Sequence, residues 1–150
     1  MPDPDVGRVR ELLSEIEEAL GLLDELFSRP REEFLSSWRD RFAARYLLME
    51  LVEACSSLGV HLLEALRNRV PSSYAQVFNM MAEEGLISWR VAEGMRKLAG
   101  LRNLLVHRYW EVDDGRIYDE ARAGGLELIR EFMREVRAYL ASRIGAGEGI

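Results

Sequence analysis

The side chains best suited to chemistry lie in one short stretch, LRNLLVHRYWEVDD, at residues 101–114. Within eight residues it carries Arg102, Asn103, His107 and Tyr109, and the chain has only one other histidine, His61. An imidazole has an ordinary pKa of about 6.5, so it can exchange protons near neutrality. A guanidinium is always charged and binds phosphate oxygens in a bidentate way. Such residues suit phosphodiester cleavage by an RNA 2′-hydroxyl, which needs proton transfer and charge stabilisation but no metal ion.

On an ideal helix this stretch divides into two faces. Three leucines fall on one side and are expected to face a core. The opposite arc comprises Arg102, Asn103, His107 and Tyr109 around Val106 and Trp110. A solvent-facing arc would be rich in Glu and Lys, so we expect this one to be covered by a ligand, a partner or a second subunit.

The spacing of the two cationic residues favours a symmetric partner. On one ideal helix Arg102 and His107 are separated by about 140° and about 7.5 Å of rise, which is wide for one small target. A two-fold related copy would bring a second Arg and His alongside. In the alternative interpretation His107 satisfies a helix C-terminus, where a cation is favoured, while Tyr109 and Trp110 only pack.

The charge of the chain is unevenly distributed. The net charge is −6, which argues against a surface coated for bulk nucleic-acid binding. Between Arg90 and Trp110 there are five basic residues and one acidic residue, Glu93, so this window carries +4 and the remainder −10. The window is compatible with a confined phosphate site, or with a solvated helix face.

Composition restricts the class of protein further. A chain of 150 residues with 48% hydrophobic residues predicts one folded domain. The one cysteine, Cys55, lies in an apolar helical pattern and is expected to be buried, and no zinc or iron–sulfur spacing exists. No signal peptide is evident, and no apolar run approaches the roughly 18 residues of a membrane span. A cytoplasmic protein is therefore expected.

Apolar spacing of three and four residues predicts helices over almost the whole chain. The predicted helices cover 6–27, about 32–69, 73–84, 89–100 and 101–110, a short piece from 116 to 123, and a last helix from 126. The sequence predicts an all-α, up-and-down bundle with two long N-terminal helices in a hairpin and shorter helices packed on them. Residues 1–144 are expected to form one domain, and 145–150 a flexible tail.

Several residues are expected to punctuate these helices. Ser73 with Gln76 has the spacing of a capping box, and Ser88 can cap the next helix. Gly85 suits a left-handed C-terminal position, and Gly100 either ends or bends its helix. The segment DDGR, residues 113–116, is expected to be a turn, with Asp113 and Asp114 as turn and cap residues.

Three other polar sites are expected to be structural. His61 is expected to make a packing contact or a hydrogen bond on a helix face. Arg108 is expected at the surface or in a salt bridge. Ser72 is expected to be a capping residue and not a nucleophile.

The segment RNLLVHRY resembles the HEPN superfamily, and especially the HepT toxin family, whose motif is Arg, four residues, His, any residue, Tyr. Arg102, His107 and Tyr109 match at this spacing, and Asn103 matches the polar residue that usually follows the Arg. The flanking segments PSSYAQVFNMMAEEGLI and KLAGLRNLLVHRYWEVDD are also similar to HepT sequences. The resemblance covers about residues 40 to 140.

This resemblance implies a HEPN-type helical homodimer in which the Arg–His pairs of two chains face each other. It implies a type VII toxin, a metal-independent endoribonuclease with Arg102, His107 and Asn103 as catalytic residues and no cofactor. It also implies a partner, an MntA-type minimal nucleotidyltransferase antitoxin that transfers AMP to Tyr109. Two alternatives stay open: a non-catalytic HEPN module that assists a nucleotidyltransferase, and a purely structural helical dimer.

Overall fold

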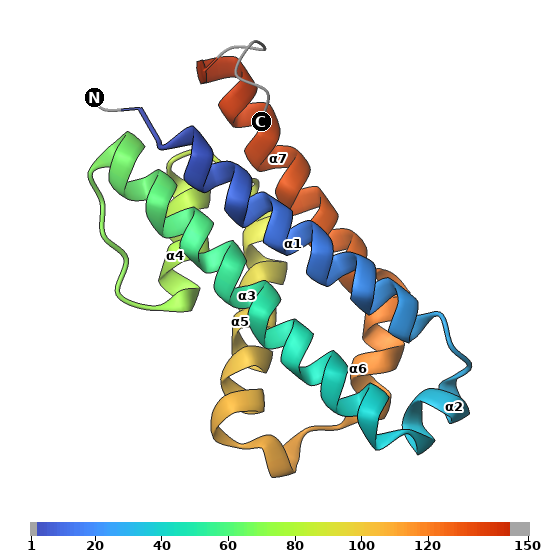
Figure 1. The fold of residues 1–150 in the computed structure, drawn as a ribbon. Helices are drawn as coiled ribbons and strands as arrows, with labels where there is room; N and C mark the ends of the chain where they lie inside the picture. The colour runs from blue at the N-terminus through green and yellow to red at the C-terminus, as the bar shows by residue number, and fades with distance from the viewer. Residues whose placement is uncertain (1–2, 145–150) are drawn as a thin grey trace.

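The computed structural model describes residues 3–144 as a bundle of α-helices (Figure 1). The α-helices are α1 (Val6–Phe27), α2 (Arg31–Ser36), α3 (Trp38–Arg67), α4 (Tyr74–Glu83), α5 (Trp89–His107), α6 (Asp114–Glu120) and α7 (Leu126–Ile144). A 3-10 turn, η1 (Tyr109–Glu111), follows α5, and a π-type turn, η2 (Ala121–Gly125), joins α6 to α7. This part of the chain contains no strand, so the all-α prediction is confirmed. The predicted tail, 145–150, lies outside the described residues.

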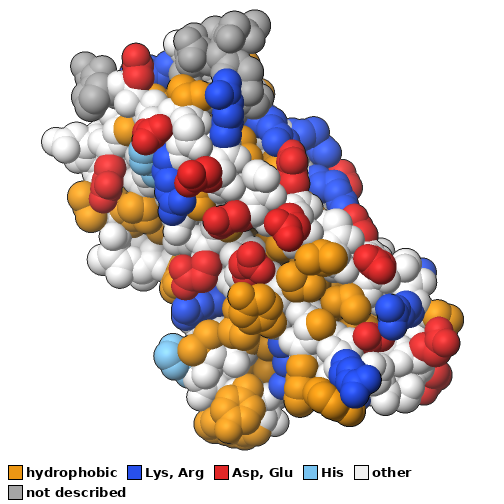
Figure 2. Space-filling view, viewed as in Figure 1, with side chains coloured by type: hydrophobic (Ala, Val, Ile, Leu, Met, Phe, Trp, Pro, Cys, Tyr) orange, Lys and Arg blue, Asp and Glu red, His pale blue; other side chains and the backbone are white. Residues whose placement is uncertain are grey.

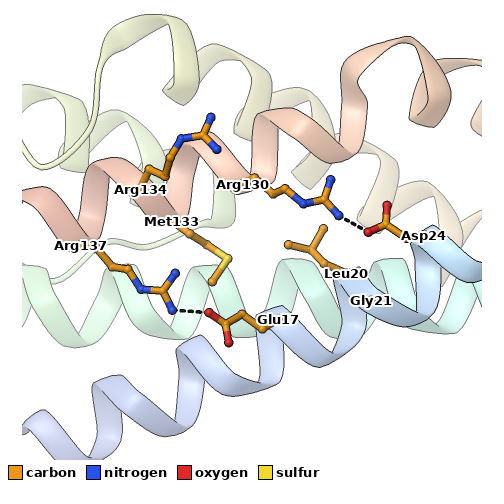
Figure 3. A pocket seen from close by; sticks show the side chains of 8 residues that line it. All are labelled: Glu17, Leu20, Gly21, Asp24, Arg130, Met133, Arg134 and Arg137. Atoms are coloured by element: carbon orange, nitrogen blue, oxygen red, sulfur yellow. Dashed lines mark hydrogen bonds and ion pairs between the residues drawn. The ribbon is translucent and has the colours of Figure 1, made fainter. Parts of the chain in front are cut away.

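The two long helices α1 and α3 form the expected hairpin, and α7 lies along α1 (Figure 1). The bounds of α1 match the prediction because Asp5 caps its first turn, accepting a hydrogen bond from the backbone N–H of Arg8 at 3.2 Å. Arg130 and Arg137 on α7 pair with Asp24 and Glu17 on α1 (Figure 3). These ion pairs lie at the surface of the contact between α1 and α7, whose interior is apolar. One buried hydrophobic cluster includes residues from every α-helix of the described chain.

The predicted helix over 32–69 is divided in two by Ser37. Its backbone is extended (φ −100°, ψ 105°), and its hydroxyl accepts a hydrogen bond from the N–H of Asp40 at 3.1 Å. A serine that caps a new helix in this way interrupts an apolar periodicity that otherwise continues. The expectation of one uninterrupted helix was therefore wrong. At its other end α3 stops at Arg67, because Asn68 adopts a left-handed conformation (φ 50°).

The caps around α4 and α5 follow the sequence closely. The Ser73 hydroxyl accepts from the N–H of Gln76 at 3.1 Å, and the Ser88 hydroxyl accepts from the N–H of Val91 at 3.3 Å. The returning bond of the capping box differs from the prediction, because the Gln76 side chain accepts from the hydroxyl and N–H of Ser72 instead of from Ser73. Gly85 has the expected positive φ, 78°.

The DDGR segment is a helix start and not a turn. Asp113 caps α6 by accepting from the N–H of Arg116 at 3.1 Å, and Gly115 is buried inside the first turn. A Cβ at Gly115 would stand 2.6 Å from Nη2 of Arg31, so a larger residue there would displace the end of the Arg31 side chain. The chain then bends at Gly124 (φ 115°) before α7, where the predicted break lies.

The helix α3 runs through the centre of the bundle. By length and hydropathy alone it could cross a membrane, contrary to the sequence expectation, but 61% of that segment is buried within the bundle, as in a core helix of a folded domain. Cys55 on α3 is fully buried as predicted, and burial raises the pKa of its thiol far above the ordinary range.

Candidate active site

The residues of the motif lie on two elements instead of one. Helix α5 continues through Gly100 and ends at His107, because Arg108 leaves the helical conformation (φ −140°, ψ 46°). Arg102, Asn103 and His107 are therefore on α5, whereas Tyr109 begins η1. The prediction that Tyr109 shares a helical stripe with Arg102 is wrong.

The two predicted faces of α5 are nevertheless present. Leu105 is buried, Leu101 is partly buried against the core, and Leu104 is partly buried. On the other face the apolar centre is uncovered in the single chain, with Val106 39% and Trp110 69% exposed. A surface of this kind is expected to be covered in the working protein.

Arg102 is held by side chains from three helices. Its Nη2 donates to Oε1 of Glu53 on α3 at 2.9 Å, and its Nη1 donates to Oδ1 of the adjacent Asn103 at 3.3 Å. Its guanidinium lies 4.6 Å from the centre of the Tyr74 ring at the start of α4, within cation–π distance. The side chain is only 18% exposed, and its buried Nε has no hydrogen-bond partner among the described residues. Arg102 is thus fixed in place with part of its hydrogen-bonding capacity unused.

Glu53 and Tyr74 are the residues that sequence reasoning did not assign. The Tyr74 hydroxyl donates to the same Glu53 oxygen that receives Arg102. Burial raises the pKa of Tyr74, and its hydrogen bond to Glu53 raises it further, so the phenol stays protonated and acts as a donor. Glu53 is 49 residues from Arg102, so only the fold brings them together. The one sequence signal was the SYAQVF segment, which contains Tyr74.

His107 is exposed at the last position of α5. Its ring makes no hydrogen bond or ion pair with the described residues, which leaves both nitrogens available to a ligand or partner. Arg102 lies five residues before His107, which is the last residue of α5. No group of three or more His, Cys, Asp or Glu side chains within residues 3–144 is arranged to hold a metal ion.

Tyr109 combines a fixed backbone with a free side chain. The residue is 60% exposed, and its ring meets Trp110 edge to face at 5.3 Å. Its carbonyl oxygen accepts a hydrogen bond from Arg45 at 3.3 Å. Arg45 in turn binds both carboxylate oxygens of Asp114, at 2.9 and 2.7 Å. Asp114, expected to be a turn residue, therefore anchors η1 to α3.

The other polar residues have structural positions. Nε2 of His61 accepts a hydrogen bond from the N–H of Asp5 at 3.0 Å, as the structural interpretation expected. Arg108 forms an exposed ion pair with Glu111 at 2.9 Å. The catalytic roles expected of Arg102, Asn103 and His107, and the modification expected at Tyr109, stay predictions.

Comparison with known proteins defines the class of this fold and site. Residues 16–136 match the model of the family described as Ribonuclease HepT-like, and the chain belongs to this family. It is similar to a candidate RNase of Archaeoglobus fulgidus, with 34% identity over 105 residues that make up 70% of each chain. It is also similar to the tRNA nuclease HepT of Aphanizomenon flos-aquae, with 23% identity over 109 residues, 73% of this chain and 74% of the relative.

Solved structures share the fold. YutE of Bacillus subtilis, a cytosolic protein of unknown function, superposes with a TM-score of 0.83 at 22% identity, covering 97% of this chain and 96% of YutE. The tri-AMPylated HEPN toxin of Shewanella oneidensis, solved in complex with its MNT antitoxin, gives a TM-score of 0.80 at 21% identity, covering 87% and 97%. The HEPN-type helical bundle predicted from the sequence is confirmed.

Proposed function

We propose that this chain is the toxin of a type VII toxin–antitoxin system, a metal-independent endoribonuclease that uses Arg102 and His107. The observation that carries the proposal is the fixed Arg102, whose guanidinium is held by Glu53 and stacked on Tyr74, while its buried Nε has no partner among residues 3–144. A cation positioned before the substrate arrives needs no rearrangement to stabilise charge that develops on phosphate oxygens. The family and its nuclease-named relatives support the same reaction.

The reaction requires only groups that this site and its RNA substrate supply. The ribose 2′-oxygen attacks the adjacent phosphorus, and the bond from phosphorus to the 5′-oxygen of the next nucleotide breaks. His107 takes up the 2′-hydroxyl proton and delivers it to the leaving 5′-oxygen. Arg102 stabilises the added negative charge of the phosphorane, and Asn103 helps to position the phosphate. The products are a 2′,3′-cyclic phosphate and a 5′-hydroxyl.

The purified chain tests this proposal directly. Incubated with RNA, it is expected to cleave and to leave 2′,3′-cyclic phosphate ends, and cleavage is expected to persist in EDTA because no step uses a metal ion. End-group analysis and gel electrophoresis provide the measurement. Activity lost on chelation would contradict the mechanism. An inert chain that nevertheless stimulates a cognate nucleotidyltransferase would establish the alternative, a non-catalytic HEPN module.

A homodimer completes the proposed site. Figure 2 shows hydrophobic side chains gathered over the end of α5 and the N-terminal half of α3, away from the charged upper half of the view. The exposed members of this apolar surface are Trp38, Phe42, Tyr46, Val106, Tyr109 and Trp110. An exposed apolar surface of several aromatic residues is typical of an interface. Contact between two chains through this surface would bring the Arg102 and His107 of both chains to the dimer interface.

Light scattering at micromolar concentration is therefore expected to give about twice the chain mass of 17.2 kDa. Trp110→Glu is expected to shift the protein toward monomer, because it would bury an unpaired charge in the interface. Trp89→Glu is a matched control, since Trp89 is exposed to a similar degree outside the apolar surface. A monomeric unmodified chain, or equal effects of the two substitutions, would contradict the composite site.

A further inference from the structure

A groove beside the motif offers a second kind of recognition. It has a volume of about 620 Å³ and runs between the C-terminal half of α3 and the start of α4. It reaches the motif at Asn103, and Glu53 and Tyr74, which hold Arg102, also line it. This volume lies within the roughly 300–1,000 Å³ of sites that bind small ligands. An RNA with a phosphate at Arg102 would have the groove within reach of a neighbouring nucleotide.

The groove contains two carboxylates, Glu53 and Glu64, together with hydroxyl and amide groups that can donate or accept hydrogen bonds. Glu53 receives both of its hydrogen bonds on Oε1, so its Oε2 has no partner among the described residues. The carboxylate of Glu64, one further lining residue, also forms no ion pair or hydrogen bond within the described chain. Two carboxylates with unused oxygens repel phosphate and attract a group that is rich in N–H donors.

The remaining lining includes serine hydroxyls, the His61 ring and apolar side chains. Because Nε2 of His61 accepts a backbone hydrogen bond, the proton of the neutral imidazole is on Nδ1, which is then a donor. Val60 and Val77 provide apolar surface for the face of a flat ring. Another groove, between α1 and α7, has a volume of about 350 Å³ (Figure 3). It differs from the groove beside the motif because its Arg130 and Arg137 are already paired with Asp24 and Glu17.

Guanine is the RNA base that fits this pattern of acceptors. Its Watson–Crick edge presents N1–H and an exocyclic amino group side by side, which match the two oxygens of one carboxylate. Adenine and cytosine place an acceptor beside their amino group, and uracil has a single N–H between two carbonyls. Proteins read single-stranded RNA by hydrogen bonds to these edges combined with packing on the base face.

We propose that the groove between α3 and α4 is a guanine-binding subsite next to the scissile phosphate, with Glu64 and the free oxygen of Glu53 as the acceptors. The subsite rests on the proposed nuclease function, and it adds base specificity to that function. Arg102 binds the phosphate, and the groove selects the neighbouring base.

Glu64→Gln is the variant that tests the subsite, because Glu64 does not touch Arg102. Glu50→Gln is the matched control, an acid of the same helix outside the groove. Four short RNAs that differ only in the nucleotide beside the cleavage site are the substrates. The native chain is expected to cleave the guanine RNA at least about tenfold faster, measured as kcat/KM, and Glu64→Gln to remove that preference while leaving the other three rates unchanged.

Replacing guanosine by inosine, which lacks the amino group, is expected to lower kcat/KM in the native chain and to have little effect in Glu64→Gln. No preference for guanine, or a preference retained in Glu64→Gln and lost in Glu50→Gln, would overturn the subsite even though cleavage itself succeeded.

Binding of guanosine monophosphate, measured by NMR against adenosine monophosphate, separates failure of the subsite from failure of the nuclease proposal. Selective binding that is weakened by Glu64→Gln is expected even if no RNA is cleaved. Equal or absent binding of the two nucleotides would overturn the subsite. Absent nucleotide binding together with loss of the dimer or of nucleotidyltransferase binding in Glu64→Gln would assign the groove to a basic protein segment instead.

Discussion

Arg102→Ala and His107→Ala are each expected to lower RNA cleavage by about 10²–10⁴-fold and to abolish toxicity on expression. Arg102→Ala removes the charge that stabilises the phosphorane, and His107→Ala removes the group that transfers the proton. Neither change should unfold the chain. His107 is exposed, and Glu53, left without Arg102, is itself about half exposed and can be hydrated. Circular dichroism is therefore expected to show an unchanged helical signal.

Two further variants make this result specific. Arg108→Ala removes an exposed cation of the same segment, which pairs with Glu111, and this variant is expected to cleave RNA normally. Arg102→Lys keeps the charge but loses the planar fork and the stacking on Tyr74, so it is expected to recover only a small part of the activity. Native rates in Arg102→Ala or His107→Ala would show that neither residue is catalytic.

Co-expression with a cognate MntA-type nucleotidyltransferase is expected to raise the intact mass by one or more AMP units, located at Tyr109, and to suppress RNA cleavage. Each AMP adds a base and at least one negative phosphate to the segment directly after His107. The added group would compete with RNA for the cationic residues and repel the incoming backbone. Mass spectrometry of the digested protein identifies the modified residue.

Tyr109→Phe is expected to block the modification and to yield a toxin that the partner cannot silence, while retaining cleavage. Tyr46→Phe is the control, because Tyr46 is 61% exposed and Tyr109 60%, and both lie on the same apolar surface. Silencing of Tyr109→Phe without a change in mass would mean that the partner acts by binding alone. Silencing with AMP at another tyrosine would mean that Tyr109 was the wrong acceptor.

Local patterns predicted most of the helical architecture. The bounds of α1 follow from its apolar spacing and the cap at Asp5, and the breaks at Gly85 and Gly124 follow from their need for positive φ. The errors in helix boundaries arose where the same residue type is compatible with two local structures. A serine such as Ser37 can lie on a helix surface or start a new helix, and Asp–Asp–Gly can make a turn or begin a helix.

The candidate site was predicted in part for the same reason. Motif spacing identified Arg102 and His107, but the helical wheel was extended three residues too far, since nothing local marks His107 as the end of α5. The partners of Arg102 were beyond any local pattern. Glu53 and Tyr74 belong to other helices, and their contact with Arg102 depends on the packing of α3, α4 and α5.

The anchoring of η1 has a consequence for the lifetime of a chain modified at Tyr109. The Tyr109 carbonyl is held by Arg45, which is fixed by Asp114, while the Tyr109 side chain extends outward and contributes nothing to the core. A bulky group added to that side chain would leave the buried contacts within one chain in place. Proteases that require an unfolded chain degrade a protein at a rate that depends on how often it unfolds. A modification that does not increase unfolding therefore does not speed degradation. Modified molecules would therefore persist in the cell as long as unmodified ones.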